Sequence, residues 1–242
     1  MSTEAKIFWG IGLLSAALML GAFLFPAERP VADEFPWHIE HPTPETTRVF
    51  GLTLGKSTPA DAVQRFREKA EYALFKSSDG SISAEAYFEQ VNLAGLRSKV
   101  VLTLNIDADE LARMHDRGLR ASATSSGRKI TVSQEDVARL SSVPFVSLTL
   151  IPGVRVPEEV FQKRFGKPAQ VIQEEESGAI HHLYPQHALD ITTSADKTQK
   201  QILQYVPPGD FQRLISPLLK SGSHVLQNGD AHPPTSTSPG SR

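Results

Sequence analysis

The chain has 242 residues, with no cysteine, 25 basic and 27 acidic side chains, and a net charge of −2. The absence of cysteine excludes disulfides, thiolate metal sites, a cysteine nucleophile and a lipid anchor on cysteine. The near-neutral balance gives none of the clustered basic charge that nucleic-acid binding needs, so we expect no nucleic-acid partner.

A membrane-spanning helix is the first element that we expect. Residues 7–25 contain no charged side chain. As a helix they would be about 28 Å long, which suits a hydrocarbon core of roughly 30 Å. We therefore predict that this segment contacts membrane lipid, chiefly through its large apolar side chains: Ile7, Phe8, Trp9, Leu13, Leu14, Leu18, Leu20, Phe23, Leu24 and Phe25.

Two other fates compete with this one for the segment. A cleaved signal peptide needs a shorter apolar core and a small-x-small cleavage site, whereas this run ends in the bulky Phe23-Leu24-Phe25-Pro26. A buried soluble helix needs a polar stripe, and none interrupts the run. We predict a retained signal anchor that follows a short tail at residues 1–6. The flanking Lys6 and Arg29 give almost no orientation bias. The short tail and the large following domain favour a single-pass protein of the inner membrane, with its C-terminal domain on the periplasmic side.

The segments that flank the folded part differ from it in composition. Residues 26–48 are rich in proline, which favours extended conformations, and we predict a semi-rigid tether. Trp37 in this tether would sit either near the lipid headgroups or against the domain. Residues 221–242 are rich in Ser, Pro, Gly and Thr, and we predict a disordered tail.

Between these flanks we predict an α+β fold built from two small units, each a short helix followed by an antiparallel meander. The first unit spans residues 49–106, a connecting α/β insert spans 107–146, and the second unit with a terminal helix spans 147–220. A weak repeat supports this division. Leu52-Thr53-Leu54-Gly55 is followed by Pro59, and Leu148-Thr149-Leu150 is followed by Gly153 and Pro157. In each copy glycine ends a strand and proline suits the start of a helix.

Alternating apolar residues and turn signals give the individual elements. In the first unit we expect strands at 72–76, 81–91 and 99–106. In the insert we expect a helix at 108–116, a strand at 129–132, and a helix that Ser133 caps and that ends before Pro144. In the second unit we expect strands at 170–176, 179–184, 189–193 and 201–206, and then a helix at 211–220 that is interrupted near Pro217. Whether the two units share one sheet stays open at this point.

The second unit resembles the SmpA/OmlA (BamE-like) family of small envelope lipoproteins over residues 148–207. The matching features are Leu150-x-x-Gly153, a helix that ends in Phe165-Gly166-Lys167-Pro168, and a meander that carries Tyr184. In the first unit Arg67-Glu68-Lys69 stands where the family has Gly-x-Pro. The family carries a lipidated cysteine, which this chain lacks, so the helix at 7–25 would serve as the anchor instead. The resemblance implies a scaffolding or assembly role with an envelope protein partner, and it assigns no interaction residue.

Few side chains suggest a catalytic or metal-binding site. His181, His182 and His187 are the only histidine cluster, but neighbouring residues of a strand point to opposite faces, so we expect no metal site there. Glu174-Glu175-Glu176 reads as a solvated strand end. We expect no catalytic residue and no cofactor. Strand tyrosines would either pack in the core or form an interaction surface, and Tyr87, Tyr184 and Tyr205 are the surface candidates.

We therefore expect a non-enzymatic, membrane-anchored envelope domain that mediates protein–protein interaction or assembly. The alternative is an exported domain that binds a small molecule or lipid in a pocket. A metal-dependent or other hydrolase is the third hypothesis.

Overall fold

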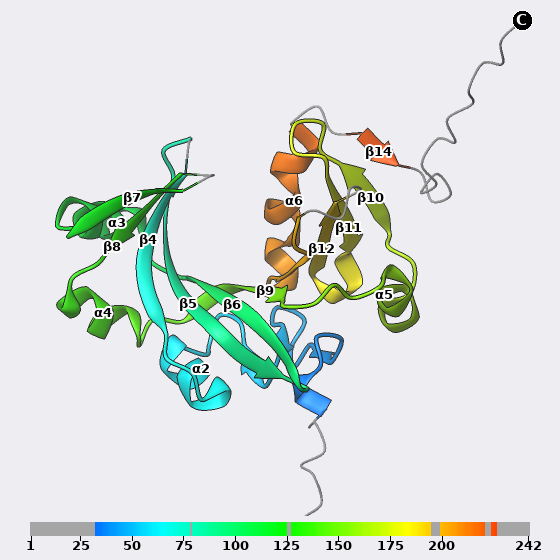
Figure 1. The fold of residues 1–242 in the computed structure, drawn as a ribbon, viewed down its shortest axis with the longest axis horizontal. Helices are drawn as coiled ribbons and strands as arrows, with labels where there is room; N and C mark the ends of the chain where they lie inside the picture. The colour runs from blue at the N-terminus through cyan, green and yellow to red at the C-terminus, as the bar shows by residue number, and fades with distance from the viewer. Residues whose placement is uncertain (1–31, 78, 125–126, 195–198, 221–223, 227–242) are drawn as a thin grey trace, which may run out of the picture. The chain divides into compact units, whose positions relative to one another are not determined.

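The computed structural model describes residues 32–77, 79–124, 127–194, 199–220 and 224–226 (Figure 1). From Asp33 onward these residues belong to one compact unit. The described part of the chain is α+β, as predicted from the sequence, and contains five α-helices. The helices are α2 (Pro59–Phe66), α3 (Ala108–Asp116), α4 (Gln134–Leu140), α5 (Glu158–Phe165) and α6 (Phe211–Lys220).

The described strands form two antiparallel sheets. A small one holds β1 (Ile39–Glu40), β2 (Arg48–Val49) and β3 (Leu52–Thr53). The large one has 11 strands, in the spatial order β14 (His224–Leu226), β10 (Gln170–Gln173), β11 (Ala179–Tyr184), β12 (Leu189–Ser194), β13 (Ile202–Tyr205), β9 (Phe145–Pro152), β6 (Leu96–Leu104), β5 (Ile82–Leu93), β4 (Glu71–Ser77), β8 (Gly127–Thr131) and β7 (Arg120–Thr124). The meanders β4–β6 and β10–β13 therefore belong to one sheet, which answers the question that the sequence left open.

Local signals fix the starts of the helices where the sequence predicted them. Thr58 caps α2 by accepting a hydrogen bond from the backbone N–H of Asp61, whose carboxylate accepts one from the N–H of Thr58 at 2.8 Å. Ser133 caps α4 by accepting a hydrogen bond from the backbone N–H of Asp136, and Asp107 caps α3 by accepting one from the N–H of Glu110. Each cap satisfies backbone donors that a helix leaves unpaired at its N-terminus.

A buried ionic network joins α3 to α4. Glu110 and Asp136 are 4% and 1% exposed, and Arg117 donates hydrogen bonds to both carboxylates. Arg139 of α4 adds a hydrogen bond to Glu110 at 2.9 Å. The hydrogen bonds from the arginines hold the pKa of both carboxyl groups below the usual range, so both stay ionised and paired.

The main core lies on one face of the sheet. Register pairs place Ala86, Leu102, Leu148 and Tyr205 side by side across β5, β6, β9 and β13, and all four are fully buried. Helices α2 to α5 contribute their buried side chains to this core. Phe66 of α2, for example, meets Phe88 edge-on at a centroid distance of 5.4 Å.

A smaller core lies under α6. It joins Phe211, Ile215 and Leu218 of α6 to Ile172 of β10 and Leu183 of β11. On the opposite face of the same strands, Phe165 of α5 contacts the ring of Tyr184 at 5.4 Å. Figure 1 shows α5 and α6 on the two sides of β10–β12, so this end of the sheet is covered on both faces.

Residues 33–48, which the sequence analysis placed in the tether, pack on the domain. Trp37 is half-buried against the main core, with the guanidinium of Arg164 at 4.6 Å from its ring centroid. Tyr205 donates a hydrogen bond to the carbonyl of Pro36 at 2.8 Å. Of the two positions considered for Trp37, the structure therefore shows the one against the domain.

The remaining flanking predictions concern the two ends of the chain. Three residues of the expected tail, His224–Leu226, form β14 and pair with β10. The predicted anchor at residues 7–25 lies outside the described residues. None of the described helices is long and apolar enough to cross a membrane.

Gly153 gives a test of how β9 is fixed to β6. Its N–H donates to the carbonyl of Arg97 at 2.8 Å, and a Cβ at this position would lie 2.3 Å from the same oxygen. We expect Gly153→Ala to lower the free energy of unfolding by roughly 1–3 kcal/mol, because the strands must move apart.

Gly209→Ala is the matched control, since no described atom other than those of its chain neighbours lies within 4 Å of its Cβ position. Urea unfolding of the two variants measures the difference. Equal stabilities would show that β9 does not approach β6 this closely.

Candidate functional site

The face of the large sheet that lies opposite the main core is only partly covered. Over β4, β5, β6 and β9 this face has no described helix. We call this surface the open face and define it by Phe75, Ser83, Tyr87, Val101, Thr103, Thr149 and Ile151. Register pairs set Tyr87 beside Val101, and Val101 beside Thr149. All seven side chains are half-buried, whereas the residues that alternate with them lie in the main core. The buried side chains of α2 to α5 lie in that core, and those of α6 lie at the other end of the sheet.

Tyr87 is a large aromatic side chain of the open face with two polar neighbours. Its hydroxyl donates a hydrogen bond to the carboxylate of Glu85, and the Nζ atom of Lys129 lies 4.4 Å from its ring centroid. Burial, and then the negative charge of Glu85, raise the pKa of Tyr87, so the hydroxyl stays protonated. Its neighbours thus hold the ring in place before any partner binds.

Ion pairs flank the apolar residues of the open face. Lys99 pairs with Glu89, and Lys129 pairs with Glu71 at 3.8 Å. An apolar centre with a polar rim is the composition that protein interfaces show.

The other two tyrosine candidates do not reach this surface. Tyr184 and Tyr205 are 1% and 0% exposed and belong to the main core. Burial, and then Glu158, raise the pKa of Tyr184 to about 12. Of the three tyrosines chosen from the sequence as surface candidates, the structure therefore offers only Tyr87 to a partner. The strand positions of the other two face the helices that cover the core.

His181 and His182 lie on a strand, as the sequence predicted, and both are buried. His181 and His182 are 9% and 8% exposed, and they face opposite sides of the sheet. His182 contacts the hydroxyl of Thr193 at 3.2 Å, whereas His187 packs against the ring of Phe165 at 5.4 Å. These three side chains do not form a metal-type cluster among the described residues.

His181 instead forms a buried pair with Asp190. Its Nδ1 atom lies 2.6 Å from a carboxylate oxygen of Asp190, on the face that α6 covers. Burial alone would lower the pKa of His181, but the hydrogen bond and charge of Asp190, with Glu174 nearby, outweigh burial and raise it. The Nε2 atom lies 3.7 Å from a carboxylate oxygen of Glu174 and has no hydrogen-bond partner among the described residues, so no described hydroxyl is aligned on it as a nucleophile. Sequence reasoning missed this pair because the partners are brought together only by the register of β11 on β12.

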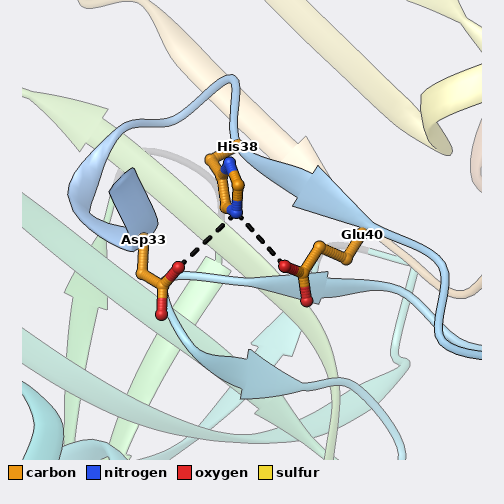
Figure 2. Close-up of side chains that lie close together, drawn as sticks. All are labelled: Asp33, His38 and Glu40. Carbon is orange, nitrogen blue, oxygen red and sulfur yellow. Dashed lines mark hydrogen bonds and ion pairs between the residues drawn. The ribbon is translucent and has the colours of Figure 1, made fainter. Parts of the chain in front are cut away.

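A second group of titratable residues lies where the described chain begins. His38 lies between Asp33 and Glu40, as Figure 2 shows, with Nε2–oxygen distances of 3.5 and 3.2 Å. One ligand atom from each residue lies within 4.8 Å of the others, a spacing that suits a small divalent cation completed by water. The three side chains are 36–48% exposed and already contact one another. This arrangement needs no metal, and as an exposed ion-pair group it contributes about 1 kcal/mol at most.

Comparison with known proteins identifies no family for this chain. No protein-family model, curated protein or solved structure matches the chain. The likeness to SmpA/OmlA lipoproteins therefore stays an expectation from the sequence.

The raised pKa of His181 makes a prediction about stability and pH. The pKa of His181 is about 6.5 in the unfolded chain and higher in the folded protein. Protonation of His181 therefore stabilises the fold fully at pH values below the unfolded pKa, and this stability is lost as pH rises through the folded pKa. We expect wild type to exceed His181→Gln in free energy of unfolding at pH 5.5, and this excess to shrink by pH 9. Urea unfolding at both pH values gives the difference. An excess that grows with pH would contradict the assignment.

Proposed function

We propose that this protein is a non-enzymatic, membrane-tethered interaction domain of the bacterial envelope. In this proposal the helix at residues 7–25 holds it in the inner membrane, and the domain on the periplasmic side binds a protein partner through the open face. The apolar, charge-free run of the sequence supports the anchor. The resemblance to SmpA/OmlA lipoproteins supports an assembly role.

The observation that carries the proposal is the contrast between the two ends of one sheet face. Around Leu183 this face is buried under α6, whereas around Tyr87 and Val101 it has no described helix over it. Antiparallel sheets often leave one face in water, and such faces are then mainly polar. Here Phe75, Tyr87, Val101 and Ile151 are apolar or aromatic, which favours a protein partner over water alone.

The flanking charges indicate the chemistry of that partner. The rim pairs Lys99–Glu89 and Lys129–Glu71 hold both signs of charge, so the surface has no strong net field. We expect a partner with a small apolar centre and a polar rim rather than a highly charged one.

Substitution at the centre of the open face tests the proposal. Val101→Lys places a charge between Tyr87 and Thr149, where a partner would have to desolvate it. We expect the tagged full chain, crosslinked in native cells and purified in detergent, to recover a specific partner. Val101→Lys should lower that recovery roughly tenfold, which corresponds to a loss of about 1.4 kcal/mol.

Val225→Lys is the matched control, because Val225 is 54% exposed on β14 at the other edge of the sheet. It should recover the partner as wild type does. Tyr87→Ser repeats the test with a variant that adds no charge. The proposal fails if no specific partner is recovered, or if Val101→Lys and Tyr87→Ser both recover it fully.

A further inference from the structure

A cavity of about 660 Å³ lies where β4, β7 and β8 meet the end of α3. Its basic lining residues are Lys76, His115, Arg120 and Arg128, and none of the described residues that line it is an aspartate or glutamate. The rest of the wall is mostly small, with Gly80, Gly118, Ala121 and Gly127 among its residues. We call this cavity the cationic pocket.

The register of the strands places two of these cations directly opposite each other. Lys76 on β4 pairs with Arg128 on β8. Like charges at directly opposed positions of a sheet destabilise it. Among the described residues, no hydrogen bond or ion pair joins the side chain of Lys76, Arg120 or Arg128 to a carboxylate.

The neighbouring Lys129 shows that a positive charge on β8 can be paired with a carboxylate. It occupies the other face of β8, where it pairs with Glu71 and lies over Tyr87. Positive charge is therefore balanced on the open face. Among the described cations that line the cationic pocket, only His115 contacts a carboxylate, that of Asp116 at 3.4 Å.

Close backbone contacts hold the pocket in shape. A Cβ on Gly127 would lie 2.2 Å from the carbonyl oxygen of Lys76, and one on Gly118 would lie 2.5 Å from a side-chain carbon of Ile130. Glycine at position 127 lets β8 approach β4 closely, and glycine at position 118 lets the end of α3 approach β8.

From these observations we infer that the cationic pocket binds an anion that carries phosphate groups, either a soluble phosphate compound or an anionic lipid headgroup. An arginine fork and a lysine ammonium are the side chains that phosphate oxygens favour, and a bound phosphate would remove the repulsion between Lys76 and Arg128. The pocket volume accommodates a group of that size. This inference does not rest on the proposed protein partner, because Lys76 and Arg128 lie on the sheet face opposite Lys129 and the open face.

Calorimetric titration of the full chain in neutral detergent tests the inference. The two probes are pyrophosphate and soluble dihexanoylphosphatidylglycerol, each at constant ionic strength. We expect saturable binding of at least one probe, weakened at least tenfold in Arg128→Gln and in Lys76→Gln. Binding of pyrophosphate alone identifies a soluble ligand, and binding of the lipid alone identifies a headgroup.

Lys129→Gln is the matched control, since it removes the same charge from the same strand on the other face. It should bind as wild type does. In the absence of anion, Arg128→Gln should melt no lower than wild type, because it removes one of two opposed cations. Absence of saturable binding by both probes, or equal binding by Arg128→Gln and wild type, would overturn the inference.

Discussion

The arrangement of the domain depends on β9, which hydrogen-bonds to β6 on one side and to β13 on the other. Without this strand the meanders β4–β6 and β10–β13 would be separate sheets with free edges. With it, Leu102, Leu148 and Tyr205 line up in one continuous buried row. Removal of such a row from water is the main favourable contribution to folding. It also fixes which residues alternate outward on the other face.

The sheet face opposite the main core is covered at one end and uncovered by any described helix at the other. At the α6 end it holds a small apolar core and the buried pair of His181 and Asp190. At the β4–β6 end it holds Tyr87, whose hydroxyl and ring are both engaged by neighbours. A side chain fixed in this way loses little entropy when a partner binds, which favours affinity. Function is therefore proposed for the end of the face that lacks a described helix.

Local features of the sequence were enough to predict the α+β class and most elements. Thr58, Pro59 and Ser133 mark helix starts through short-range hydrogen bonds and backbone geometry, and these carry the same meaning in any fold. The edge strand β7 was missed, because its residues, Arg120–Thr124, are all exposed and give no apolar alternation. The surface tyrosines were harder still. Period-two alternation shows that Tyr87 and Tyr205 each point to one face, but only the non-local pairing through β9 decides which face is covered.

The most direct test of the account is site-specific photocrosslinking in native cells, with a photoreactive amino acid at Thr149 on the open face and, separately, at Leu119, which is 68% exposed before β7. We expect Thr149 to crosslink to one protein partner in the membrane fraction and Leu119 not to do so. No crosslink at Thr149, or the same products from both positions, would contradict the claim that the open face is the binding surface.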